Sequence, residues 1–279
     1  MGKIIWLASF PKSGNTWLRA FLHNLLRNPN EPYDINKLAD FTKGDAQMAW
    51  YNLIDKRPGS EITKEDVAKL RPRVHRLMTQ SRPDSVFIKT HNKLVEDRGT
   101  PMITMEHTAG AIYIIRNPLD VTLSFADHYA LSIDEAIKTM ATPELQTENS
   151  DKYCYEVYGS WSEHVLSWTL NAHPGLHTIR YEDMLEAPMK TFAGVLKFLG
   201  LNVNRERLDK AIKLSSFRVL QEQEKRQGFV EKTEVSERFF REGKAGQWKR
   251  QMTQGQVDAV VAAHREQMAR FGYWPLPYG

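Results

Sequence analysis

The most informative run of residues in this chain is Ile4-Ile5-Trp6-Leu7-Ala8-Ser9-Phe10-Pro11-Lys12-Ser13-Gly14-Asn15-Thr16-Trp17. Its apolar beginning is typical of a strand buried on both faces of a parallel sheet, and its end is typical of a turn that opens a helix. The first N–H groups of a helix lack partners and, together with the helix dipole, favour an anion. Lys12 adds a positive charge, Gly14 allows close approach of the backbone, and Ser13 and Thr16 supply hydroxyls. The run therefore predicts a phosphate site.

This predicted site differs from a Walker A loop, which requires Gly-x-x-x-x-Gly-Lys followed by Ser or Thr. Here Lys12 precedes the single glycine of the run, Gly14, and no predicted strand is followed by an obvious carboxylate for magnesium. An ordinary strand–turn–helix unit with a solvated Lys12 is the alternative interpretation of the same residues.

A second run repeats the pattern, namely Ala111-Ile112-Tyr113-Ile114-Ile115-Arg116-Asn117-Pro118-Leu119-Asp120-Val121-Thr122-Leu123-Ser124. Its buried strand delivers Arg116 to the carboxyl end, which is where open α/β sheets bind ligands. Asn117 is a helix cap, Pro118 suits the first helical position, and Ser124 follows two turns later. An arginine grips a phosphate bidentately, and a hydroxyl can complete the cage. The alternative is a capped helix whose Arg116 pairs with a carboxylate.

Strands and helices alternate along the chain. Apolar runs predict parallel strands at Ile4–Ser9, Val86–Thr90, Ala111–Arg116 and His177–Tyr181. Apolar stripes predict helices at Thr16–Leu26, Pro118–Tyr129, Ser160–Ala172, Met184–Leu199 and Thr253–Phe271. The alternation predicts an α/β protein with a doubly wound parallel sheet flanked by helices. We expect a single domain over residues 1–279, with a helical insertion at 34–82 and a lid-like loop at 218–246.

Composition restricts the class of protein. The 279 residues are 41% hydrophobic and carry a formal net charge of +4, which argues against disorder and against nucleic-acid packaging but allows a local anionic site. Cys154 is the only cysteine, so an internal disulfide and a cysteine-based zinc site are excluded. No apolar run near the start approaches the roughly 20 residues of a membrane span, and no signal peptide is evident. We expect a soluble, cytoplasmic protein.

The two phosphate runs together carry a family resemblance. PKSGNTW at 11–17 and YIIRNPLDVTLS at 113–124 resemble the 5′- and 3′-phosphate motifs of the sulfotransferases that use 3′-phosphoadenosine 5′-phosphosulfate (PAPS). Further segments follow in the family's order, at Ile88–His91, Arg180–Asp183, Ser215–Phe217 and Phe240–Lys249. The resemblance covers nearly the whole chain. It is to the cytosolic type in a short, bacterial-like form, and it implies a P-loop-NTPase-like parallel sheet.

The resemblance implies that the chain binds PAPS and releases adenosine 3′,5′-bisphosphate (PAP), with no metal required. The residues implied for the 5′ end are Lys12, Ser13, Gly14, Asn15 and Thr16. Those implied for the 3′-phosphate are Arg116, Ser124, Arg241 and Gly243, the last two from the lid. Those implied for the adenine are Trp17 and Phe217 as a sandwich, with Tyr181 and Ser215 nearby.

Sulfonate transfer needs a deprotonated acceptor oxygen and neutralisation of charge on the sulfonate and on the departing phosphate. The resemblance points to His91 as the general base, and an imidazole, whose pKa is ordinarily about 6.5, suits that task. Lys89 would stabilise the sulfonate oxygens and Lys12 the leaving oxygen. A helix cap or a structural hydrogen bond is the alternative role for His91.

Three departures from the family pattern leave details open. Asn15 stands where threonine is commoner, and Glu242 stands where a basic residue is usual in the lid. Gln254 and Asp258 replace two residues of the family's dimer motif, so the oligomeric state, monomer or homodimer, is open. We expect a small-molecule acceptor and no nucleic-acid partner. The identity of the acceptor and the choice between O- and N-sulfonation are not fixed by the sequence.

Two other functions remain as alternatives. A P-loop-type small-molecule kinase is disfavoured by the position of Lys12 and by the missing magnesium carboxylate. A non-catalytic nucleotide-binding module would keep the fold without turnover, and substitution of His91 distinguishes it from an enzyme.

Overall fold

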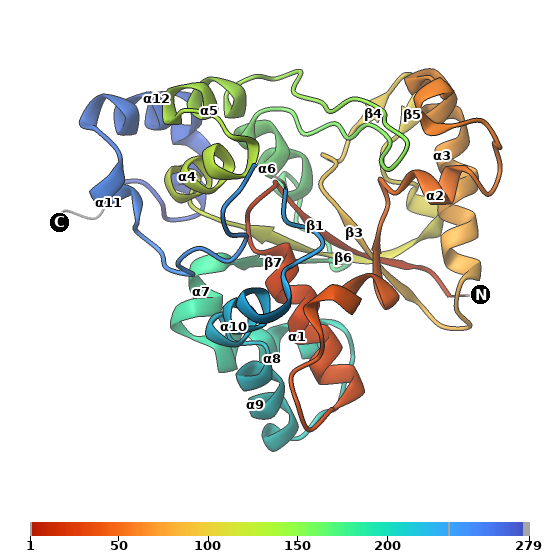
Figure 1. Cartoon of the computed structure of the whole chain (residues 1–279), viewed down its shortest axis with the longest axis horizontal. Coiled ribbons are helices and arrows are strands. Elements are labelled where there is room, and N and C mark those ends of the chain that lie inside the picture. Colours follow the sequence, from red (N-terminus) through yellow and green to blue (C-terminus); the bar gives the residue numbers. More distant parts are fainter. Residues whose placement is uncertain (1, 234, 276–279) are drawn as a thin grey trace. The chain divides into compact units, whose positions relative to one another are not determined.

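A five-stranded sheet runs through the computed structural model, which describes residues 2–233 and 235–275 (Figure 1). Its strands lie in the order β2 (Thr42–Gly44), β3 (Val86–Thr90), β1 (Ile4–Ser9), β6 (Thr108–Ile115) and β7 (Leu176–Arg180). β1 pairs in parallel with β3, and β3 pairs in parallel with β2. Parallel neighbours need long crossover connections, which the intervening helices provide. The predicted parallel sheet flanked by helices is confirmed.

The register of β1 against β3 determines which functional segments meet. Ala8 lies opposite Thr90, so the two strands end at the same edge of the sheet. The residues that follow, Ser9 and His91, are therefore brought next to each other. Most of both strands is buried, which explains why neither shows alternating polar and apolar positions.

Four of the five strands follow the prediction to within three residues at either end. The missed strand, β2, is only three residues long and lies in a polar segment that was expected to contain helices alone. It forms because its backbone pairs with β3 at the edge of the sheet, with Gly44 opposite Lys89. A strand of three residues is too short to show a hydrophobic pattern, so its pairing with β3 could not be predicted from the sequence.

The chain divides into two compact units, each assembled from three separate stretches of sequence. Unit 1 comprises residues 1–10, 42–113 and 139–178, and unit 2 comprises residues 11–41, 114–138 and 179–279. Unit 1 contains most of the sheet, and the last two residues of β6 and of β7 belong to unit 2. Because the chain passes repeatedly from one unit to the other, no single linker separates them.

The helices of unit 2 include three that match the predicted ones closely, namely α1 (Asn15–Arg27), α4 (Pro118–Tyr129) and α12 (Gln254–Arg270). Within this unit α1 packs against α9 (Arg205–Leu214), which also contacts α8 (Pro188–Phe198), as Figure 1 shows. α4 contacts both α12 and α11 (Trp248–Gln251). The helices that follow the two phosphate motifs, α1 and α4, are therefore each packed against other helices of unit 2.

The expected single helix at 184–199 is wrong. α7 (Tyr181–Glu186) ends before Ala187, and α8 begins at Pro188. Ala187 has φ −136° and ψ 55°, outside the helical region, because a residue before proline is sterically disfavoured from helical geometry. The apolar stripe continues across this break, which is why the pattern indicated one helix.

The expected lid-like loop at 218–246 is helical in its first third, which α10 (Phe217–Gln227) occupies. The described residues from there to α11 form no helix or strand. α10 anchors this irregular segment, because the Glu224 carboxylate accepts the N–H groups of Phe239 and Phe240 at 2.7 and 2.9 Å. Gln221 also donates to the carbonyl oxygens of Phe240 and Arg241.

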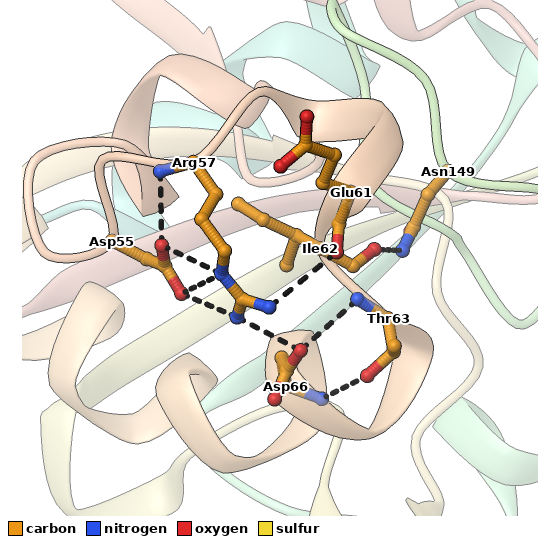
Figure 2. A network of polar contacts seen from close by, with 7 residues as sticks. All are labelled: Asp55, Arg57, Glu61, Ile62, Thr63, Asp66 and Asn149. Atoms are coloured by element: carbon orange, nitrogen blue, oxygen red, sulfur yellow. Dashed lines mark hydrogen bonds and ion pairs between the residues drawn. The ribbon is translucent and has the colours of Figure 1, made fainter.

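The segment 34–82 contains the expected helices, with η1 (Ile35–Asp40) in unit 2 and α2 (Met48–Tyr51), η2 (Gly59–Glu61) and α3 (Lys64–Gln80) in unit 1. Figure 2 shows how α3 begins. The Thr63 hydroxyl accepts the Asp66 N–H, and the Asp66 carboxylate accepts the Thr63 N–H in return. Arg57 donates to both Asp55 and Asp66, which holds the preceding loop against this cap. Such reciprocal caps stabilise a helix start.

The remaining elements are α5 (Ile133–Met140), α6 (Trp161–Thr169), η3 (Met105–His107) and the antiparallel pair β4 (Glu96–Asp97) and β5 (Thr100–Pro101). α6 confirms the helix predicted at Ser160–Ala172, with Ser160 as its N-cap. Within residues 2–233 and 235–275, no helix has the length and apolar character needed to cross a membrane.

Candidate functional site

The turn that precedes α1 has an unusual backbone. Lys12 has φ +66°, a left-handed conformation that is uncommon for residues with a side chain, and Gly14 has φ +105°. Gly14 is the N-cap of α1, and among the described residues no side chain caps this helix start and no acidic residue lies in its first turn. A Cβ at Gly14 would lie 2.6 Å from a ring carbon of Tyr181. The positive end of the α1 dipole is therefore available to an anion.

Three buried polar atoms around this turn lack hydrogen-bond partners within the described part of unit 2. They are Ser13 Oγ, Trp17 Nε1 and Arg116 Nε. The three residues are only 1%, 8% and 7% exposed. Buried polar atoms in folded proteins nearly always have a partner, and leaving one unsatisfied costs about 1–3 kcal/mol. The arrangement fits a polar ligand that would supply the missing partners.

Arg116 lies against the same turn. Its Nη1 donates to the backbone oxygen of Lys12 at 2.9 Å, and its guanidinium carbon is 4.3 Å from the ring centroid of Tyr181. Asn117 accepts the Leu119 N–H and so caps α4, as predicted. The two predicted phosphate motifs therefore meet within unit 2. The Lys12 ammonium lies 4.0 Å from the ring centroid of Phe239, in the segment that follows α10.

The aromatic residues implied for a base fall into two groups. Trp17 packs edge-on against Tyr181, with ring centroids 5.7 Å apart, and also contacts Phe192. Phe217 packs against Phe240 and covers Gly243 so closely that a Cβ there would lie 2.2 Å from its ring. The sandwich of an adenine between Trp17 and Phe217 stays a prediction. The buried Ser215 hydroxyl donates to the carbonyl oxygen of Ala211 at 2.8 Å.

The segment from Arg241 to Trp248 is tied to α4. Arg241 Nη1 donates to the carbonyl oxygen of Leu123 at 3.3 Å, next to the half-buried Ser124. Asp120, which is 2% exposed, accepts the N–H groups of Gly246 at 2.6 Å and Trp248 at 3.2 Å. The sequence reasoning missed Asp120. Its signal was its place on the same helix as Ser124, in the first turn of α4 and four residues after Arg116.

The candidate base, His91, lies in unit 1. Its Nδ1 is 2.8 Å from the backbone oxygen of Ser9. A carbonyl oxygen only accepts hydrogen bonds, so Nδ1 carries the proton and Nε2 of the neutral ring carries the lone pair. Lys89 precedes it by two residues in β3 and is half-buried, as is His91. Lys89 and His91 are thus both at the carboxyl end of β3, with the ring tautomer that a general base at Nε2 requires.

Two acidic residues that the sequence reasoning missed surround this end of β3. Glu156 accepts the His91 N–H at 3.3 Å and the Tyr158 hydroxyl at 3.0 Å. Burial of its carboxylate, together with the negative charge of Asp45, raises the pKa of Glu156 to about 7, against the opposing charge of Lys89. Asp45 accepts hydrogen bonds from the Thr90 hydroxyl and the Asn92 amide, at 2.8 and 3.0 Å, and burial raises its pKa as well.

The placement of the predicted site residues follows the division into units. All the residues implied for the nucleotide lie in unit 2, whereas Lys89 and His91 lie in unit 1. For Glu156, the one signal in the sequence was a carboxylate between Tyr155 and Val157. In residues 2–233 and 235–275, no group of three or more His, Cys, Asp or Glu is arranged to hold a metal ion.

The sequence of this chain is similar to a known protein family and to several known proteins. A family model described as "Sulfotransferase domain" matches residues 3–272. Sulfotransferase 2A6 of Rattus norvegicus is 28% identical over 98% of this chain and 87% of its own length. A 3-alpha-hydroxysteroid sulfotransferase of Cavia porcellus is 27% identical over 96% of this chain and 83% of its own.

Two solved structures show the same fold. A mouse sulfotransferase, SULT7A1, crystallised with PAP, has a TM-score of 0.60 at 19% identity and covers 95% of this chain and 84% of its own. A retinol dehydratase crystallised with androsterone and PAP has a TM-score of 0.65 at 17% identity and covers 99% of this chain and 82% of its own.

Proposed function

Because the chain belongs to the sulfotransferase family, we propose that it transfers a sulfonate group from PAPS to a hydroxyl or amine of a small-molecule acceptor. The observation that carries the choice of donor is the set of unsatisfied buried atoms, Ser13 Oγ, Trp17 Nε1 and Arg116 Nε, around the uncapped start of α1. They surround a place where an anion is favoured, and PAPS carries phosphates on both sides of its ribose.

Residues of unit 2 take the nucleotide in this proposal. The 5′ end is held by Lys12, Ser13, Gly14, Asn15 and Thr16, through the N–H groups of the helix start and through side chains. The 3′-phosphate is held by Arg116, Ser124, Arg241 and Gly243. The adenine is held by Trp17, Tyr181, Ser215 and Phe217. The contact between Arg116 and the Lys12 carbonyl supports this assignment, because it joins the residues proposed for the two phosphates.

The proton is taken by His91 of unit 1, and two lysines neutralise negative charge. His91 presents an unprotonated Nε2 when neutral and accepts the proton of the acceptor hydroxyl or amine as its oxygen or nitrogen attacks sulfur. Lys89 stabilises the sulfonate oxygens, and Lys12 neutralises the charge on the departing phosphate oxygen. PAPS itself supplies an activated sulfonate, because the phosphosulfate bridge breaks with PAP as the leaving group.

The experiment that tests the function measures transfer from radiolabelled PAPS to a panel of phenols, alcohols and amines. We expect at least one acceptor to be sulfonated by the wild type, and His91→Ala to lower kcat by about 100-fold or more while PAP binding is kept. Sulfonation that His91→Ala leaves unchanged would remove His91 as the base. PAP binding without transfer to any acceptor would favour a non-catalytic module.

We also propose that one family domain spans the chain and that the protein works in the cytoplasm. The family model extends from residue 3 to residue 272, across both units. The sole cysteine, Cys154, is a buried free thiol, and burial raises its pKa to about 12, so it is an unreactive group.

A further inference from the structure

The loop that carries the candidate base, Thr90–Leu94, is held along its backbone by one other stretch of unit 1, residues 156–168. The His91 carbonyl accepts from His164 Nε2 at 3.0 Å, and the His91 N–H donates to Glu156 at 3.3 Å. Further backbone bonds to this stretch join Lys93 N–H to the Val157 carbonyl, Leu94 N–H to the Ser167 hydroxyl, and Trp168 Nε1–H to the Asn92 carbonyl. The side chains of Asn92 and Lys93 add a bond from the Val157 N–H and an ion pair with Glu163. The base is therefore positioned by a segment about 65 to 75 residues away in sequence.

His164 supports His91 from the carbonyl side and cannot itself act as a base there. Its Nε2 must donate, because its partner is a carbonyl oxygen, so its Nδ1 accepts the Tyr113 hydroxyl at 2.9 Å. The side chain is fully buried, and burial lowers its pKa to about 3. His164 is thus a neutral ring with both nitrogens occupied.

Glu156 supports His91 from the amide side and is chemically different. One oxygen of its carboxylate accepts the His91 N–H, and the other accepts the Tyr158 hydroxyl. Tyr158 in turn lies edge-on to the His91 ring, with centroids 6.4 Å apart and an interplanar angle of 87°. One carboxylate therefore fixes both the backbone of the base and an aromatic side chain beside its imidazole.

We propose that Glu156 is a positioning residue for the sulfonate-transfer reaction, acting through His91. The inference rests on the proposed function, in that His91 is taken as the base. Glu156 holds the His91 backbone while the Ser9 carbonyl holds Nδ1, and these two contacts together aim Nε2. A displacement of about 1 Å in a reacting group can cost roughly 100-fold in rate, so loss of one anchor is expected to lower kcat strongly.

The test compares substitutions at Glu156 with one at Glu148. Glu156→Ala removes the acceptor, and we expect kcat to fall about 10- to 100-fold while the Kd for PAP stays within 2-fold. Glu156→Gln keeps an oxygen for the His91 N–H and an amide N–H₂ that can donate to Tyr158, so it should restore most of kcat. Glu148→Ala is the control, because the Glu148 side chain is 81% exposed and pairs with Lys64, outside both the loop and residues 156–168, and its kcat should match the wild type.

A double substitution identifies the route of the effect. If Glu156 acts through His91, adding Glu156→Ala to His91→Ala lowers the residual rate no further. An equal loss in both backgrounds would show an independent role and overturn the inference. So would a kcat for Glu156→Ala equal to that of the wild type, or a Glu156→Gln variant as slow as Glu156→Ala.

Folding and function are separated by one more variant. Glu156→Asp keeps the charge but withdraws the carboxylate by one methylene, so we expect a kcat at least about 5-fold lower even if Glu156→Ala does not fold. An unchanged kcat for Glu156→Asp would contradict the positioning role. A His91→Ala variant with full activity would instead mean that the proposed base is wrong, which is a different failure.

Discussion

At the scale of single residues, Arg116 joins the two predicted phosphate motifs. Its Nη1 donates to the Lys12 carbonyl and its guanidinium stacks near Tyr181, while its buried Nε has no partner within the described residues. The Nη1 contact holds the guanidinium in place, and the buried Nε–H still needs an acceptor. That combination is what a bidentate phosphate contact requires.

We therefore expect Arg116→Ala to weaken PAP binding by about 10- to 100-fold, since hydrogen bonds to charged groups contribute roughly 1.5–3 kcal/mol. Isothermal titration of PAP measures this. Arg218→Ala is the control, because the Arg218 side chain is 85% exposed. Equal PAP affinity in Arg116→Ala and Arg218→Ala would refute the phosphate role of Arg116.

The raised pKa of Glu156 makes the free energy of unfolding depend on pH, and it also sets the sign of that dependence. Burial raises the pKa of Glu156 from its ordinary value of 4.5 to about 7, so the folded chain binds more protons there than the unfolded chain between these values. This contribution to stability is fully present below about pH 4.5 and is lost as the pH rises through about 7. Glu156→Gln removes the titration, so its stability relative to wild type should rise by on the order of 1–3 kcal/mol between pH 5 and pH 8.

Urea unfolding of both proteins at the two pH values measures that difference. Glu135→Gln provides a comparison of opposite sign, because hydrogen bonds from Ser132 lower the pKa of Glu135. A stability difference between Glu156→Gln and wild type that does not change with pH would contradict the burial of this carboxylate.

The residues that the sequence identified are those whose role follows from a local pattern. Lys12, Gly14 and Arg116 stand where a strand ends and a helix begins, so their neighbours in sequence are also their neighbours in space. Asp45 and Glu156 were missed because their partners at Thr90, His91 and Asn92 are 45 to 65 residues away. No local pattern records such contacts.

At the scale of elements, the turn before α1 depends on Gly14. The residue has φ +105°, and a Cβ there would lie 2.6 Å from Tyr181. Gly14→Ala should therefore lower the free energy of unfolding by more than about 1 kcal/mol and weaken PAP binding as well.

A second glycine near a helix start is the matched control for this prediction. Gly255, at the beginning of α12, has open space around its Cα, and a Cβ there meets no atom within 4 Å. Gly255→Ala should stabilise the protein by about 0.5–1 kcal/mol, with PAP affinity unchanged. Denaturant unfolding and PAP titration compare the variants. Gly14→Ala behaving like Gly255→Ala would contradict the account of the turn.

Elements were predictable where burial imposes a strong pattern. β1 and β3 begin with continuous apolar runs, Ile4–Ala8 and Val86–Ile88, most of whose residues are buried. The start of α4 is marked by Asn117 as the cap and Pro118 as the first helical residue. The failures have opposite causes. β2 is too short to show a pattern and exists through pairing with β3, whereas the break at Ala187–Pro188 is a local event that the longer apolar stripe concealed.

At the scale of the whole molecule, the residues proposed for the nucleotide and those proposed for the base belong to different units. The sequence order of motifs predicted the parallel sheet and the flanking helices, but not this division. The division depends on which of the separate stretches of sequence pack densely with each other, and no single motif predicts that packing. Because none of Lys89, His91 and Glu156 is proposed to hold the nucleotide, we expect their substitution to change turnover while leaving PAP affinity intact.

The most direct test of the central claim is the melting temperature of the wild-type protein with PAP in the absence of magnesium. At about 100 times its Kd, PAP should add about 2.7 kcal/mol of stability and raise the melting temperature by roughly 5 °C or more. ATP with magnesium at the same concentration should have a clearly smaller effect. Stabilisation by ATP with magnesium and none by PAP would contradict the account.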